Sequence, residues 1–135
     1  MSPSRTRVEI VRSYFEHLTA SDTEAIVGLF ADDGFVVSPV LGTMAAADFY
    51  RTLDDASSCN VLTVHGVMSS DDDRFHAAHF TYDWTLAAGD EIRFEGVDMF
   101  EFDDADRIVS MKIFYDTHPT RSEVGDKYRR PDAPA

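Results

Sequence analysis

The stretch EIRFEGVDMFEFDDADRIVSMKIFYD, residues 91–116, decides the fold. Two apolar-rich runs, residues 91–102 and 107–116, flank a turn-forming DDAD segment, a pattern typical of two antiparallel strands joined by a hairpin. Two similar runs precede it, over residues 61–68 and 74–86, and SSDDD and AAGD follow them as turn segments. We therefore expect an antiparallel meander of four strands to occupy the chain after residue 60.

The preceding part of the chain has helical periodicity. Ser21 followed by Glu24 is a capping-box signature, and Thr43 can cap a further helix. Residues 35–37 favour a short strand that ends at Ser38-Pro39, because proline cannot donate to a strand ladder. Helices are predicted over residues 5–20, from residue 21 to about residues 32–34, and over residues 44–54.

Helices followed by a meander are typical of an α+β layer, in which the helices cover one face of a curved sheet. A chain of 135 residues, 44% of them hydrophobic, has the length of one ordinary domain. We expect this domain to span residues 1–116. Residues 117–135 contain three of the five prolines, scattered charges and no periodicity, which predicts a partly mobile tail.

The charge balance argues against two classes of partner. A formal net charge of -13 repels phosphate backbones and anionic lipid, so neither nucleic acid nor membrane is expected as a partner. Cys59 is the only cysteine, and the N-terminus lacks the apolar core of a signal peptide, which together predict a cytoplasmic protein. His76 and His79 would point to opposite faces of a strand, so no metal is expected, and no cofactor motif is present.

Two stretches of the sequence carry a family resemblance: YFEHLTASDTEAIVGLFADDGFVVSP, residues 14–39, and VDMFEF at residues 97–102 followed by RIVSM at residues 107–111. They resemble the nuclear transport factor 2-like superfamily, which includes SnoaL-like proteins, and are most similar to its ketosteroid isomerases. The resemblance covers about residues 12–115. It implies a cone-shaped fold, with three N-terminal helices packed on a curved antiparallel sheet around an apolar pocket.

The resemblance also implies roles for individual residues. Tyr14 matches the oxyanion-hole tyrosine, and Asp98 matches the aspartic acid that donates a hydrogen bond while neutral. Tyr50 matches a second tyrosine that supports the first, and Phe30 replaces a third. Ser38 occupies the position of the catalytic base, and an unassisted hydroxyl is a poor base at neutral pH. Further residues expected to line the substrate pocket are Phe94, Phe100, Met111 and Tyr115.

The missing base leaves Asp83, His79 and His65 as candidates, all in expected strands. His79, Thr81 and Asp83 alternate along one side of their strand, and Phe80, Tyr82 and Trp84 along the other. Either side could face the pocket. We include Asp83 among the catalytic candidates, because the resemblance places it at a pocket-lining position.

Three functions remain open. The first is a cofactor-independent enzyme that isomerises or cyclises an apolar carbonyl compound, such as a steroid-like or polyketide intermediate, using Tyr14 and Asp98. The second is an epoxide hydrolase or cyclase that uses Asp83 and Asp98 as paired carboxylates. The third is a noncatalytic domain that binds a small molecule. We also expect a homodimer through the outer sheet face, where Tyr82 and Trp84 would be buried.

Overall fold

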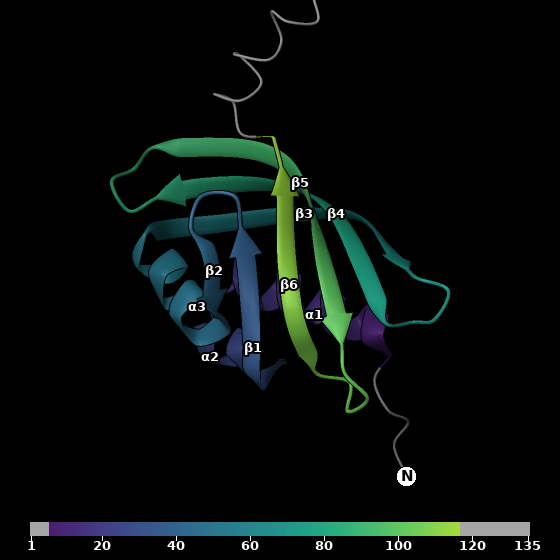
Figure 1. Cartoon of the computed structure of the whole chain (residues 1–135). Helices are drawn as coiled ribbons and strands as arrows, with labels where there is room; N and C mark the ends of the chain where they lie inside the picture. Colours follow the sequence, from purple (N-terminus) through teal and green to yellow (C-terminus); the bar gives the residue numbers. More distant parts are fainter. Residues whose placement is uncertain (1–5, 117–135) are drawn as a thin grey trace, which may run out of the picture.

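The computed structural model describes residues 6–116 of the chain (Figure 1). In chain order they form α1 (Arg7–Thr19), α2 (Thr23–Val27), β1 (Phe30–Ser38), β2 (Gly42–Ala45), α3 (Ala46–Asp55), β3 (Ser57–Ser69), β4 (Phe75–Leu86), β5 (Glu91–Phe102) and β6 (Ile108–Tyr115). The predicted tail, residues 117–135, lies outside the described residues, so its mobility stays a prediction.

The strands form one curved sheet in the order β2-β1-β6-β5-β4-β3. The expected meander is confirmed as β3 to β6, and each consecutive pair in it is antiparallel. β1 joins the other side of β6 in parallel, and β2 pairs with the outer edge of β1. The sheet therefore brings a strand from the first third of the chain beside the last strand described.

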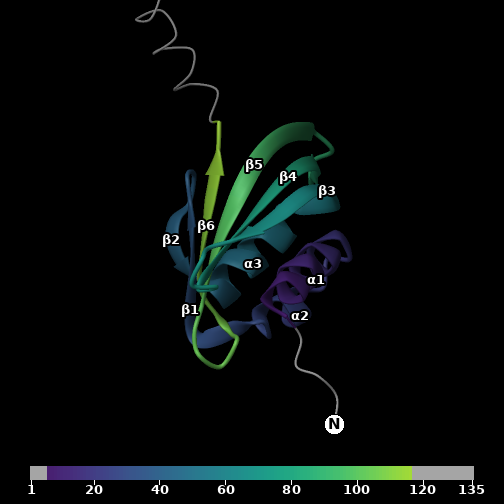
Figure 2. The same cartoon turned by 90° about the vertical axis from the view of Figure 1, so that its right-hand side faces the viewer.

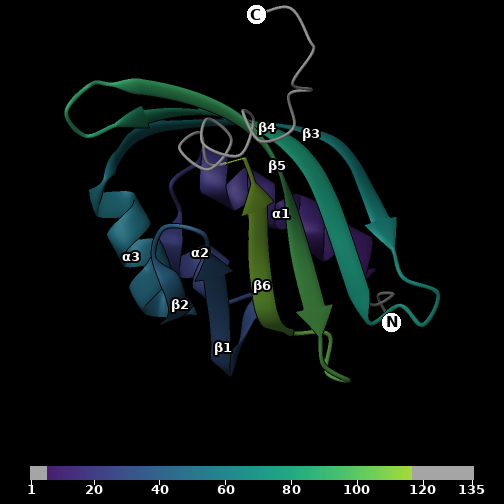
Figure 3. The same ribbon diagram turned by 45° about the horizontal axis from the view of Figure 1, so that its top comes forward.

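The helices lie on one side of the sheet, as Figure 2 shows. α1 runs beneath the curved β3 and β4, and the β4–β5 hairpin reaches over α3 (Figure 3). This arrangement is the α+β architecture of helices on a curved sheet that the sequence predicted. It encloses an apolar core between α1, α3 and the concave face of the sheet.

Strand alternation decides which side chains enter that core. On β4 the buried residues are His76, Ala78, Phe80 and Tyr82, and on β5 they are Gly96, Asp98, Phe100 and Phe102. α1 begins at its cap Thr6, whose hydroxyl accepts a hydrogen bond from the Glu9 amide. The helix then buries one stripe, which contains Val11, Tyr14, Phe15 and Leu18.

The second helix is shorter than predicted. α2 ends at Val27, with Asp22 as its cap instead of Ser21, and β1 already begins at Phe30. The Asp-Asp-Gly segment that suggested a helix end lies inside β1, where the pairing with β6 shifts register between Phe30 and Phe35. A bulge there lets both aspartates face solvent while the strand continues, so the turn-like composition was misleading.

β2 was not predicted. Ser38 pairs with Gly42, whose positive φ of 71° closes a tight hairpin, and residues 42–45 run back along β1. α3 therefore begins at Ala46, two residues later than expected, without a side-chain cap. A strand of four residues with one half-buried side chain gives too weak a period-two pattern to be recognised.

Arg7, at the start of α1, ties the helix to two hairpin turns. Its Nη1 donates to the Asp73 carbonyl at 2.7 Å, in the β3–β4 turn. Its Nη2 and Nε donate to the Asp103 carbonyl at 2.9 Å and to Asp106 Oδ1 at 2.8 Å, both in the β5–β6 turn. One guanidinium thus holds three separate segments together at the end of the sheet opposite the β4–β5 hairpin.

Candidate active site

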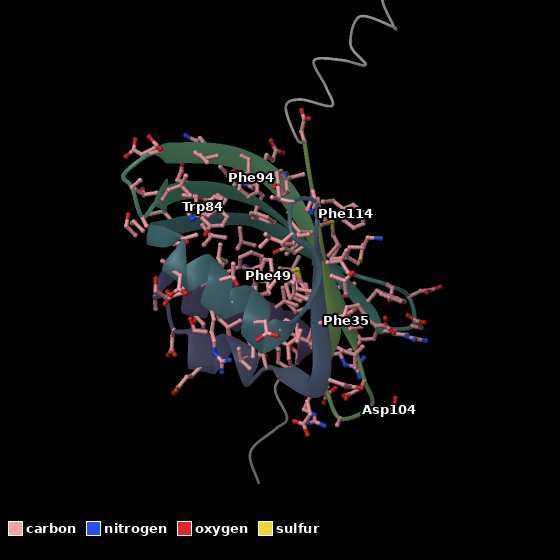
Figure 4. All side chains as sticks on the ribbon, turned by 60° about the vertical axis from the view of Figure 1, so that its left-hand side comes forward. Phe35, Phe49, Trp84, Phe94, Asp104 and Phe114 are labelled. Atoms are coloured by element: carbon pink, nitrogen blue, oxygen red, sulfur yellow. The ribbon has the colours of Figure 1, made fainter. Side chains whose placement is uncertain are left out.

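A cavity of about 270 Å³ lies between the concave face of the sheet, α1 and α3. Its walls are mostly apolar, and the exposed lining residues Val40 and Leu41 lie where it opens to solvent. Figure 4 shows Phe49, Trp84 and Phe94 directed between sheet and helix, whereas Phe35 and Phe114 lie on the outer side. The lining residues are Tyr14, Leu18, Ser38, Val40, Leu41, Phe49, Thr52, Leu53, Ala56, Leu62, Phe80, Tyr82, Trp84, Phe94, Asp98, Ile113 and Tyr115.

A wider depression of about 860 Å³ runs beside the ends of β5 and β6. It shares Phe94, Ile113 and Tyr115 with the cavity, but it is open to solvent and contains neither Tyr14 nor Asp98. The enclosed cavity is therefore the better place for chemistry, because a dry site strengthens each polar interaction within it.

Two tyrosines meet at the inner end of the cavity. The Tyr50 hydroxyl, from α3, donates to the Tyr14 hydroxyl, from α1, at 2.8 Å. Burial is the main cause that raises the pKa of both hydroxyls well above the usual value, so both stay protonated at neutral pH. Because the Tyr14 oxygen accepts the hydrogen bond from Tyr50, its own O–H remains free to donate to a bound molecule.

Asp98 is the buried carboxyl of the site. It lies on the inner face of β5, is 3% exposed, and its Oδ1 has no hydrogen-bond partner among the described residues. Desolvation raises the pKa of Asp98 well above its usual range, because no cation in the described part of the chain compensates a charge there. A protonated carboxyl can donate a hydrogen bond or a proton, and Asp98 lines the same cavity as Tyr14.

Ser38 lines the cavity at the end of β1. Its Oγ accepts a hydrogen bond from the Leu41 amide at 3.0 Å, which closes the turn to β2. Of the described residues that line the cavity, Asp98 is the one with a carboxyl group, and none is a histidine. The described lining therefore offers no second carboxylate and no histidine that could act as a general base beside Asp98.

Asp83 does not line the cavity, so the expectation that it does was wrong. Its side chain is on the outer face of β4, where Oδ1 lies 3.6 Å from Nε of Arg93. Alternation explains the placement, because Phe80, Tyr82 and Trp84 take the inner side.

His65 and His79 are also on the outer face. The His79 Nε2 lies 2.5 Å from Glu95 Oε1, and His65 Nε2 lies 2.7 Å from the Thr81 hydroxyl. None of the three candidate bases therefore reaches the cavity. Since Tyr82 and Trp84 face inward, they also cannot form the dimer surface for which they were proposed.

The other predicted pocket residues fall into two groups. Phe94 and Tyr115 line the cavity, with ring centroids 4.5 Å apart. Phe30, Tyr50, Phe100 and Met111 do not line it but are buried behind its wall, where Tyr50 is hydrogen-bonded to Tyr14. Phe100, for example, contacts the Tyr14 ring with centroids 5.1 Å apart.

Sequence reasoning missed the polar support behind Tyr82 and Trp84. The Tyr82 hydroxyl donates to Asn60 Oδ1, and Trp84 Nε1 donates to the Ser57 hydroxyl at 2.8 Å. Asn60 in turn donates to the Ser21 hydroxyl at 3.2 Å. These hydrogen bonds fix the Tyr82 hydroxyl and the Trp84 indole N–H, and the two rings form part of the cavity wall. The strand register, which pairs Tyr82 with Phe94, is the signal that identifies this face.

Neither a metal site nor a membrane-spanning helix is found in residues 6–116. No three histidine, cysteine, aspartate or glutamate side chains gather there as metal ligands. No helix in this range has the length and apolar character needed to cross a membrane.

Comparisons with known proteins match this geometry at the level of fold. The sequence family described as the SnoaL-like domain matches residues 11–111. Curated proteins give no sequence match. Solved structures give many matches, all of the first ones below 25% identity, so they bear on the fold alone.

One similar structure is SalBIII, described as an epoxide hydrolase/cyclase-like enzyme in pyran ring formation in the polyether salinomycin. It has a TM-score of 0.74 and 19% identity over 83% of this chain and 92% of that one. A protein with a ketosteroid isomerase-like fold from Catenulispora acidiphila, solved with trimethylamine, has a TM-score of 0.72 and 17% identity over 87% and 92% of the two chains.

An NTF2-like protein of unknown function from Burkholderia pseudomallei has a TM-score of 0.73 and 18% identity, covering 88% of this chain and 97% of that one. The fold class, the enclosed apolar cavity and the family match over most of the chain all agree. The chain belongs to the SnoaL-like family of the NTF2-like fold.

Proposed function

We propose that this protein is a cofactor-independent enzyme that closes a ring in, or isomerises, an apolar carbonyl compound by proton transfer. Asp98 and Tyr14 activate the carbonyl oxygen. The observation that carries the proposal is an unpartnered, fully buried carboxyl beside a free tyrosine O–H in an otherwise apolar cavity. Such donors stabilise developing negative charge on oxygen far better than water does.

One carboxyl group suffices for an intramolecular aldol closure. The enol carbon of the substrate bonds to its carbonyl carbon, and the carbonyl π electrons move to oxygen, which takes the proton of Asp98. The Asp98 carboxylate then accepts the hydroxyl proton of the enol as that group becomes a ketone. The product is an isomer of the substrate, and Asp98 recovers its proton. Tyr14 donates a hydrogen bond to the carbonyl oxygen throughout.

The placement of the outer-face residues favours this chemistry over its rivals. A paired-carboxylate epoxide opening needs a second carboxyl in the cavity, and Asp83 lies outside it. A purely binding role would gain nothing from burying an unpaired carboxyl, which costs roughly 1–3 kcal/mol or more. Ring formation is also the reaction in which SalBIII is described as acting, and SalBIII has the same fold.

The test uses a triketone probe, a methyl-substituted cyclohexanedione with an oxobutyl side chain, whose closure to a bicyclic ketol can be followed by chromatography. We expect the unaltered protein to accelerate closure and Asp98→Ala to abolish the acceleration. Asp98→Asn keeps a donor of the same shape but cannot exchange the proton, so it should also fall to background. Asp83→Asn is the matched control on the outer face and should stay fully active.

Two results would contradict this proposal. Closure at the uncatalysed rate with the unaltered protein would remove the enzymatic assignment for apolar ketones. Substantial activity in Asp98→Asn would limit Asp98 to hydrogen-bond donation and require a different proton acceptor.

A further inference from the structure

Ser38 and Asp98 lie at the same level of the sheet, on either side of Ile113. Asp98 on β5 pairs with Ile113 on β6, and the parallel register that pairs Val37 with Lys112 puts Ser38 beside Ile113 from the other side. All three side chains line the cavity. Two strand spacings separate Ser38 from Asp98, so their Cα atoms are roughly 10 Å apart. The two groups therefore address different atoms of one bound molecule.

The turn between β1 and β2 occupies one acceptor position of the Ser38 hydroxyl. Its Oγ already accepts from the Leu41 amide, and no acceptor for its proton is in range among the described residues. The hydroxyl proton is therefore available to the cavity. Tyr14 is in the same condition, because its oxygen accepts from Tyr50.

Three of the polar groups that line the cavity can thus donate a hydrogen bond into it. Tyr14 and Asp98 supply one pair at the inner end, and Ser38 supplies another donor at the same level of the sheet. The hydroxyl of Tyr82 is committed to Asn60 and the indole N–H of Trp84 to Ser57. A molecule with acceptor oxygens at two separated positions on an apolar framework would therefore engage both donor positions.

We propose that Ser38 is a specificity-determining residue that donates a hydrogen bond to a second oxygen of the substrate, which is an apolar ring compound bearing two separated acceptor oxygens. The inference rests on the proposed function, since it takes the first oxygen to be the one held by Tyr14 and Asp98. The second oxygen is a ketone, ester or ether oxygen.

A binding experiment separates the two oxygens. The probes are a saturated two-ring monoketone, decalone, and the corresponding decalindione with a carbonyl group on each ring. Trp84 is the sole tryptophan of the sequence and lines the cavity, so its fluorescence reports binding directly. We expect the diketone to bind the unaltered protein more tightly than the monoketone, by about 3- to 10-fold, the value of one neutral hydrogen bond.

Ser38→Ala should remove that advantage, so that both probes bind equally, and Ser38→Thr should restore it by returning a hydroxyl. Ser110→Ala makes the same change on the outer side of β6, opposite Phe35 and Glu101, and should change neither affinity. Thermal unfolding of each variant shows whether the turn at Leu41 survives. If Ser38→Ala and Ser38→Thr have the same melting temperature but differ in their preference for the diketone, the loss in Ser38→Ala is not caused by damage to the turn.

Failure of this inference is distinguishable from failure of the proposed function. If Tyr14→Phe weakens both probes but Ser38→Ala leaves the preference for the diketone intact, Ser38 has no role in selection and only this inference is wrong. If Tyr14→Phe changes neither affinity, or if neither probe binds, the inner oxygen site is wrong and both proposals fall together.

Discussion

Asp98 couples the chemistry of the site to the stability of the protein. Its pKa is raised by burial, so the folded chain holds a proton that the unfolded chain releases above pH of about 3.9. Between that pH and the raised pKa the folded state binds more protons, and stability falls as pH rises. The slope is about 1.4 kcal/mol per pH unit, the linkage value for one proton.

We therefore predict that Asp98→Asn is more stable than the unaltered protein at pH 7. The difference should shrink toward acid and reach a minimum near pH 4, because the amide carries no proton to lose. Urea unfolding at several pH values measures it. Asp83→Asn, at an exposed carboxyl, should show no such pH-dependent gain. A stability difference that is constant with pH would mean that Asp98 is ionised in the folded protein.

The second prediction concerns Ser38 as the position of a missing base. We expect little or no isomerisation of a Δ5-3-ketosteroid by the unaltered protein. Ser38→Asp places a carboxylate in the cavity that Tyr14 and Asp98 also line, and it should raise trace activity by up to roughly 100- to 10,000-fold. Absorbance of the conjugated product measures the rate. Robust isomerisation before the change, or none after it in a folded variant, would contradict the prediction.

At the scale of elements, the Arg7 contact holds α1 in place over the sheet. We predict that Arg7→Lys, which keeps the charge but can make fewer of the three hydrogen bonds, lowers the free energy of unfolding by roughly 1–3 kcal/mol. Chemical denaturation measures the loss. Arg12→Lys changes an exposed arginine on the same helix and should be nearly neutral, so equal effects in the two variants would show that the three contacts contribute little.

The strands also show how far sequence reasoning reached. Tyr14 and Asp98 could be placed in one cavity because each lies in a motif of the resemblance and in phase with apolar neighbours. The inner side of β4 could not be chosen, because both alternating sets are partly buried and only the pairing of Tyr82 with Phe94 decides between them. The bulge at Asp32 and Asp33 was unpredictable for a related reason, since long-range pairing with β6 overrides the local turn composition.

At the scale of the whole molecule, the outer sheet face carries exposed apolar side chains. Met68, Phe75, Phe35 and Phe114 are each more than a third exposed, and Figure 4 shows Phe35 and Phe114 on this outer side. Met99 on β5 pairs with Ala77 and Lys112, on the same face. This surface, not Tyr82 and Trp84, now motivates the proposed homodimer, because patches of this kind commonly mark interaction sites. The proposal remains one of a self-complementary contact between two copies.

We predict that the protein sediments at about twice its 15.1 kDa mass at micromolar concentration. Phe114→Asp should shift it toward monomer, because it replaces an exposed apolar ring of this surface with a charge that association would have to desolvate. Glu16→Asp, on the exposed side of α1, should leave the mass unchanged. Sedimentation of the unaltered protein as a monomer of 15.1 kDa would rule the dimer out.

The parallel pairing of β1 with β6 has a consequence for the order of events in folding. The contact joins residues 30–37 to residues 108–112, so closing it carries the entropy of a long loop. The helices, and the hairpins that join β3 to β4 and β4 to β5, need only short loops to close. They can therefore form earlier during synthesis. The cavity cannot hold a ligand until β6 is in place between β1 and β5, because Ile113 and Tyr115 belong to its wall. A nascent chain released before residue 115 would thus contain Tyr14, Ser38 and Asp98 and still have no site.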